Sequence, residues 1–238
     1  MVANLGYGLR LRSRIADDER AILFDAGTEP AAFVRNCEKN LHLDLGIVEE
    51  IAISHGHWDH MGALIAAIDK IIMSRGIRCG ACQSGGCSSN AAFDSPTARP
   101  FPSQPCPVRP RCASTGATVV NNGEARLLLD GQLYYSGEIP RVTAFEKGRV
   151  DHLCRPDDAT GDWRPDPPLF LLDERMLIAH VRDLGLVIFS ACSHAGIVNV
   201  CTEAHRLFPP DIPIHAVMGG LHLGGGHGAG HPPKQSRG

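Results

Sequence analysis

Three histidines and one aspartate follow a short apolar run, and this cluster constrains the chain more than any other feature. His55, His57, Asp59 and His60 fall within six consecutive positions, directly after the run at residues 51–53. The run is short and rich in isoleucine, which predicts a buried strand, whereas helical spacing of apolar residues begins only after the cluster. We therefore place the four polar side chains on the loop at the carboxyl end of a strand.

The chemistry of these side chains predicts a metal site. His55 and His57 stand two residues apart on extended backbone, so their rings can point toward one ion, while Asp59 and His60 are displaced enough to hold a second. Two ions about 3.5–4 Å apart activate a water and neutralise the charge that develops during hydrolysis. The alternative is that these are surface histidines in a polar loop. Three histidines and an aspartate at this spacing, however, have no common structural use. We expect one or two Zn²⁺ ions, with Mn²⁺ or Fe²⁺ as alternatives.

Two further histidines follow apolar runs and stand among small residues that leave room for a metal. His194 and His222 are therefore assigned to the same cluster, the alternative being capping or core histidines. Cys192 is left open as a ligand or a thiol nucleophile, although a buried structural cysteine after a strand is the commoner case. Asp25 is expected to support the metal loop by accepting hydrogen bonds.

The motif at residues 54–60, Ser-His-Gly-His-Trp-Asp-His, resembles the HxHxDH signature of the metallo-β-lactamase-fold superfamily. Residues 21–27 are similar to the strand and turn that precede the metal loop in that superfamily. Residues 136–141, 185–199 and 219–223 resemble a narrower branch, the 7,8-dihydropterin-6-yl-methyl-4-(ribofuranosyl)aminobenzene 5′-phosphate synthase-like proteins. Together the resemblance covers residues 5–72 and 114–225.

This resemblance implies a mixed α/β fold, a four-layer αββα sandwich, which we expect to be incomplete at its C-terminal end. It implies a metal-dependent hydrolase acting on a small, phosphorylated or pterin-like substrate, with Asp59 taking the proton of the attacking water. The alternatives are a synthase-like transferase and a catalytically impaired metal-binding remnant. The chain departs from the superfamily after the strand at residues 186–189, where Cys192-Ser193-His194 stands in place of the usual bridging aspartate.

Length and composition limit the other functions. The 238 residues, 43% of them hydrophobic, suffice for one domain, expected at residues 1–225. A net charge of −3 with scattered arginines argues against nucleic acid as a partner. The sequence has neither a membrane-length apolar run nor the layout of a signal peptide, so we expect a cytoplasmic protein. The expected partner is a small-molecule substrate. A homodimer is left open.

Residues 74–113 are rich in Arg, Pro, Cys and Ser and show no apolar period, which predicts an irregular insertion. Two alternatives are a zinc knot formed by its cysteines and an out-of-frame translation. Residues 226–238 are of low complexity and are expected to be disordered. The cysteines in question are Cys79, Cys82, Cys87, Cys106 and Cys112.

Elsewhere, apolar periodicity and turn residues define the expected elements. The segments at 117–120, 125–129 and 133–135 are expected to form one β-meander. Helices are expected at residues 29–40, 63–72 and 195–207. The remaining strands are expected at residues 1–15, 21–24, 49–53, 169–172, 176–181, 186–189 and 214–218.

Overall fold

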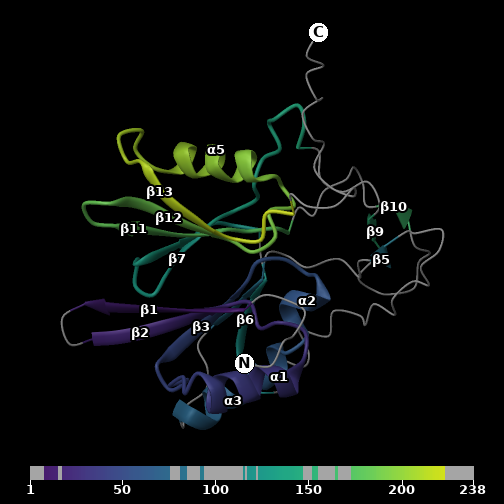
Figure 1. Cartoon of the computed structure of the whole chain (residues 1–238), viewed down its shortest axis with the longest axis vertical. Helices are drawn as coiled ribbons and strands as arrows, with labels where there is room; N and C mark the ends of the chain where they lie inside the picture. The colour runs from purple at the N-terminus through teal and green to yellow at the C-terminus, as the bar shows by residue number, and fades with distance from the viewer. Residues whose placement is uncertain are drawn as a thin grey trace.

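Two five-stranded sheets face each other, and helices cover both outer faces (Figure 1). Helices α1 (Pro30–Arg35) and α3 (Leu64–Arg75) lie under the first sheet, and α5 (Ile197–Leu207) lies over the second. The four-layer αββα sandwich predicted from the sequence is confirmed. This computed structural model describes residues 8–15, 18–75, 81–84, 92–93, 115, 117–121, 123–146, 152–154, 164–165 and 173–222.

The first sheet has the order β1-β2-β3-β4-β6. β1 pairs antiparallel with β2, and every other pair in this sheet is parallel. A parallel pair needs a crossover connection between its strands. One such crossover contains α1, whose first turn is capped by the carboxylate of Glu29, and the helix continues as the π-helix η1 (Asn36–Asn40). The strands are β1 (Leu9–Ile15), β2 (Asp18–Phe24), β3 (Val48–Ile53), β4 (Ala81–Ser84) and β6 (Thr118–Asn121).

The second sheet has the order β13-β12-β11-β8-β7. β12 and β13 are parallel and are joined through α5, whereas the other pairs are antiparallel. A separate small sheet has the order β10-β9-β5, with strands Arg164–Pro165, His152–Cys154 and Ala92–Phe93. The strands of the second sheet are β7 (Arg126–Leu128), β8 (Leu133–Tyr135), β11 (Leu177–Val181), β12 (Gly185–Ser190) and β13 (Ile214–Gly219).

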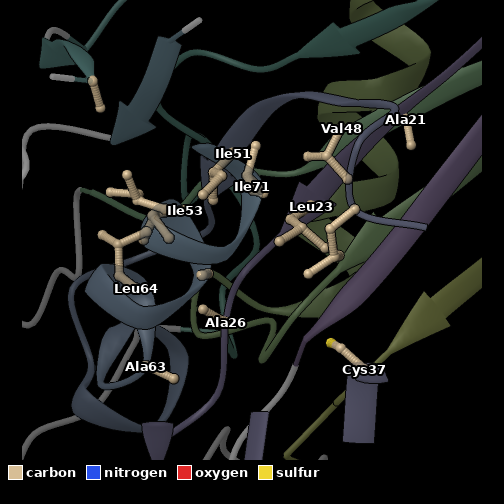
Figure 2. Close-up of a cluster of buried hydrophobic side chains, with 14 residues drawn as sticks. Ala21, Leu23, Ala26, Cys37, Val48, Ile51, Ile53, Ala63, Leu64 and Ile71 are labelled. Carbon is tan, nitrogen blue, oxygen red and sulfur yellow. The ribbon is translucent and has the colours of Figure 1, made fainter. Parts of the chain in front are cut away.

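Three apolar clusters fill the three interfaces between the layers. Side chains alternate along β2, so that Ala21 and Leu23 pack toward the helices while Ile22 and Phe24 pack toward the second sheet. Figure 2 shows the first cluster, between the first sheet and its helices. The third cluster lies between the second sheet and α5 and includes Ile188 and Val200. Burial of these faces is the main stabilising contribution to the sandwich.

The structure differs from the sequence prediction at three strands. β4 and β5 lie within the stretch expected to be irregular, where β4 pairs with β3 and β6, and β5 pairs with β9. A strand can join a sheet through its backbone groups alone, so the missing apolar period was no obstacle. β6 belongs to the first sheet whereas β7 and β8 belong to the second, so the expected three-stranded meander is wrong. The turn residues mark where the chain bends but not which sheet it enters next.

Several expectations lie outside the described residues: most of the cysteines of the zinc-knot alternative, namely Cys79, Cys87, Cys106 and Cys112, the strand at 169–172 and the tail at 226–238. Cys82 lies in β4. None of the described helices has the length and apolarity needed to cross a membrane.

Tyr135→Phe tests the polar link between the sheets. The Tyr135 hydroxyl, on β8 in the second sheet, donates to the Ile53 carbonyl of β3 at 2.7 Å, and the side chain is 2% exposed. Removing the hydroxyl leaves a buried carbonyl without this donor and should lower the free energy of unfolding by about 1–2 kcal/mol. Chemical denaturation measures this change. Tyr134→Phe, on the opposite face of the same strand, is the matched control and should change stability by less than about 0.5 kcal/mol; equal effects would contradict the link.

Candidate metal centre

The predicted site residues lie at the carboxyl ends of strands from both sheets. β3 ends at Ile53 and leads into residues 54–57, here called the β3 loop, and then into the short helix α2 (Trp58–Met61). Asp59 and His60 lie on α2, not on the loop itself as the sequence suggested. β12 ends at Ser190 and leads into residues 191–196, here called the β12 loop, which carries His194. The two loops meet at one edge of the sandwich.

Five imidazole rings converge there. The ring centroids of His55 and His57 lie 4.5 Å apart, and those of His55 and His60 lie 4.2 Å apart. The His194 ring lies 4.8 Å from His55 and 4.7 Å from His57, so the two loops meet through their histidines. The ring of His222 lies 4.8 Å from that of His194, although His222 is exposed. Asp59 joins the group through its Oδ2, 3.5 Å from His60 Nε2.

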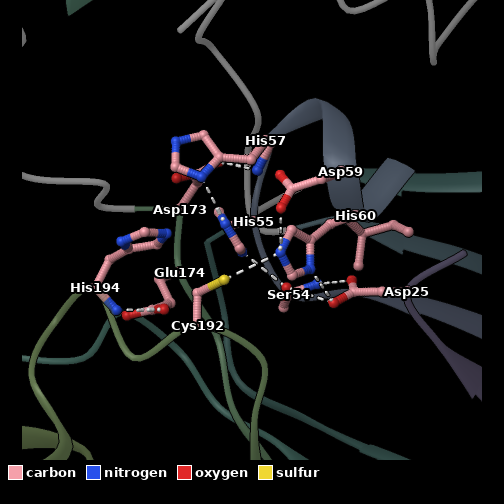
Figure 3. Close-up of polar contacts among 12 residues, drawn as sticks. Asp25, Ser54, His55, His57, Asp59, His60, Asp173, Glu174, Cys192 and His194 are labelled. Atoms are coloured by element: carbon pink, nitrogen blue, oxygen red, sulfur yellow. Dashed lines mark hydrogen bonds and ion pairs between the residues drawn. The ribbon is translucent and has the colours of Figure 1, made fainter. Parts of the chain in front are cut away.

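Three donor atoms at this edge, including the thiol of Cys192, suit a single divalent ion. Ligand atoms of His55, Cys192 and His194 all lie within 4.8 Å of one another, and all three residues are buried. Zn²⁺ binds imidazole nitrogen at about 2.0–2.1 Å and thiolate sulfur at about 2.3 Å in tetrahedral sites, so two donors of one ion lie about 3.3–3.8 Å apart. The three donors, which lie within 4.8 Å of one another, reach this spacing if their side chains shift by about 1 Å. Figure 3 shows the three side chains.

Cys192, whose role the sequence left open, lies within the candidate donor group. Its Sγ lies 3.1 Å from His60 Nε2, between the donors of the two loops. Burial raises the pKa of this thiol, while the hydrogen bond and charge of His60 lower it in part. The signal available in the sequence was its position at a strand end, two residues before His194. At such a position, no local sequence pattern distinguishes a metal-binding cysteine from a buried structural one.

Asp25 supports the β3 loop and α2, as predicted. Its carboxylate is fully buried and accepts the Ser54 N–H and the Ser54 hydroxyl, each at 2.7 Å, and it lies 2.8 Å from His60 Nδ1. Ser54 Oγ in turn lies 2.8 Å from His55 Nδ1. Burial alone would lower the pKa of His60, but the hydrogen bonds with Asp25 and Cys192 outweigh it and raise that pKa to about 11. Asp25 therefore fixes the orientation of two rings that face the site.

Residues 173–175 contact both loops. Asp173 Oδ2 accepts the Gly56 N–H at 2.7 Å, and the Arg175 N–H donates to the Ser54 carbonyl at 2.7 Å. Asp173 lies in a turn, and its carboxylate holds the backbone between the two histidines of the β3 loop.

Glu174 holds the other loop. Its two carboxylate oxygens accept the N–H groups of His194 at 2.7 Å and Ala195 at 2.5 Å, and the residue is 1% exposed (Figure 3). Burial raises the pKa of Glu174, although these two backbone donors partly counteract it. Both oxygens are thus directed at the backbone of the β12 loop.

The end of β13 and the residues after it, 219–222, here called the β13 arm, also reach the site. Gly219 has φ +139°, and a Cβ added there would lie 1.8 Å from the Ser190 carbonyl oxygen, so only glycine fits. Gly220 then donates its N–H to the Ala191 carbonyl at 2.8 Å. This close approach of β13 to β12 delivers His222 to the edge of the site.

Residues 13–76 match the family model of the metallo-β-lactamase superfamily. The solved structure of Tm1679, described as a metal-dependent hydrolase of the β-lactamase superfamily, matches with a TM-score of 0.62 and 22% sequence identity. The match covers 85% of this chain and 66% of that chain, so the chain spans slightly less than two thirds of the length of that protein.

Two other solved structures match more weakly. A provisionally assigned metallo-β-lactamase from Thermotoga maritima has a TM-score of 0.43 and 11% identity, covering 86% of this chain and 83% of that chain. The metallo-β-lactamase MIM-1 from Novosphingobium pentaromativorans has a TM-score of 0.42 and 16% identity, covering 89% and 69%. No curated protein sequence matches significantly. The chain thus has the metallo-β-lactamase fold, and its segment with the β3 loop histidines matches the family model of that superfamily.

Proposed function

We propose that the protein is a metal-dependent hydrolase that acts on a small molecule. The observation that carries this proposal is the convergence of His55, Cys192 and His194, whose ligand atoms lie within 4.8 Å of one another where strands from both sheets end. Buried clusters of imidazole and thiol groups at such an edge suit a functional metal site better than a packing role. The description of Tm1679 as a metal-dependent hydrolase is consistent with it.

His55, His57, His194 and Cys192 would hold one divalent ion, with Zn²⁺ preferred by the donor types and Mn²⁺ or Fe²⁺ as alternatives. Asp59, His60 and Cys192 form a second donor set, since His60 Nε2 lies 3.1 Å from Cys192 Sγ and 3.5 Å from Asp59 Oδ2. Cys192 then belongs to both sets and stands where the superfamily resemblance implies a bridging carboxylate.

Bound divalent metal would lower the pKa of a water and polarise the scissile group. Asp59 has a side chain that is 34% exposed, so one of its oxygens can accept a proton from an attacking water. His222 is exposed beside His194 and would meet the substrate or complete the ligand shell. The resemblance to the synthase-like branch suggests a phosphorylated or pterin-like substrate, so phosphoesters and pterins belong in the substrate panel beside lactones.

Cys192→Ser tests the thiol ligand. Cobalt bound to the wild-type protein should show sulfur-to-metal charge-transfer absorption, because a thiolate ligand donates charge to the ion. The variant should lose this absorption and bind zinc about 10–100-fold more weakly. Cys37→Ser and Cys201→Ser, at thiols outside the donor group, are the controls and should retain the band. Charge-transfer absorption and zinc affinity that are both unchanged in Cys192→Ser would remove Cys192 from the ligand set.

His55→Ala and Asp59→Asn separate metal binding from proton transfer. His55→Ala should remove the ion held by His55, His57, His194 and Cys192 and reduce hydrolysis at least about 100-fold, since a ligand is lost. Asp59→Asn should retain that ion but lower kcat about 100-fold, because the amide cannot take the proton. Metal content is measured by elemental analysis and hydrolysis with the substrate panel. His205→Ala, exposed on α5, is the control. Full activity with full metal content in His55→Ala would contradict the proposal.

A further inference from the structure

We propose that residues 173–175, here called the brace, set the distance between the β3 loop and the β12 loop, and that Glu174 is a positioning residue of the metal site. Asp173 and Arg175 contact the β3 loop, while Glu174, between them, contacts the β12 loop. One short segment thus carries hydrogen bonds to both halves of the site.

The pairing of strands does not fix the distance between the β3 loop and the β12 loop. The two loops leave strands of different sheets, so the hydrogen bonds of strand pairing do not connect them. Donors for one ion must nevertheless be held within about 0.5 Å of their working positions. A segment bonded to both loops meets this requirement, because a shift of either loop must break its hydrogen bonds to the brace.

The brace is rigid for two reasons. Its residues are 7%, 1% and 2% exposed in chain order, so water cannot readily replace their hydrogen bonds. It also leads directly into β11, the central strand of the second sheet, and the Met176 N–H donates to Ser136 Oγ at 3.0 Å. The position of the brace is therefore fixed by the core of the sandwich.

Glu174 acts through the backbone and not as a ligand. Its two oxygens accept the backbone N–H groups of His194 and Ala195, so they orient the loop that carries the His194 ring. Hydrogen bonds between a carboxylate and N–H groups are about twice as strong as neutral ones, which suits a fixed loop. The effect of Glu174 on metal affinity rests on the proposed function, whereas its effect on the two loops does not.

Glu174→Gln removes one of the two acceptors with little change in shape. In the metal-free protein, amide hydrogen exchange should accelerate at His194 and Ala195 and also at Gly56, on the opposite loop. Zinc affinity should fall about 10–100-fold. Competition with a chelating dye measures the affinity, and exchange followed by mass spectrometry or NMR measures the loops.

Glu146→Gln is the matched control. Glu146 is also a buried carboxylate that accepts two backbone N–H groups, those of Val198 and Asn199 at 2.9 Å each, but these residues of α5 carry no proposed ligand. This variant should leave exchange at Gly56 unchanged and zinc affinity within about two-fold of wild type. If it has the same effects as Glu174→Gln, a general loss of stability explains both and the brace is overturned.

Hydrogen exchange tests the brace, and metal binding by the wild-type protein tests the proposed function. Acceleration at Gly56 in Glu174→Gln supports the brace, whereas acceleration confined to His194 and Ala195 overturns it. Should Glu174→Gln fail to fold, Asp173→Asn gives the reciprocal test, in which exchange at His194 and Ala195 must rise. A wild-type protein that binds no divalent metal would overturn the proposed function, and the exchange data would still decide the brace.

Discussion

A carboxylate without access to water must be satisfied by its neighbours, and this requirement at Asp25 organises the edge of the sandwich. Burying an unpaired charge costs several kcal/mol, so the fold forms only if donors reach it. Ser54 and His60 supply them, which ties the turn after β2 to the β3 loop and to α2. Asp25 adopts a φ of +63°, which is uncommon for a residue other than glycine, and the three contacts offset that strain.

The same edge gathers more negative than positive charge. Asp25, Asp173 and Glu174 are buried there, and Asp59 lies close by, whereas the buried cationic side chains described at this edge are Arg175 and His60, whose pKa is raised to about 11. Backbone N–H groups satisfy much of this charge, as at Gly56 and His194. A bound cation would lower the remaining cost of burial, so the electrostatics of the metal-free protein already favour metal uptake.

Features set by neighbouring residues could be predicted from the sequence, and features set by distant ones could not. The apolar run at residues 21–24 and the spacing of His55 and His57 are local, and they predicted a strand and a pair of neighbouring rings, both of which the structure contains. The importance of Cys192 depends on His60, 132 positions away, and no local pattern carries that information. β4 depends on backbone pairing with β3 and β6, and so gives no apolar signal.

The β13 arm, residues 219–222, combines one position that accepts only glycine with two positions whose side chains can be replaced. Gly219 tolerates no side chain because the Ser190 carbonyl lies where a Cβ would stand. Two and three residues later, Leu221 is 36% exposed and His222 is also exposed, so both side chains can change without disturbing the layers beneath them. Replacements at these two positions therefore alter the surface beside His194, while Gly219 keeps the path of the backbone fixed.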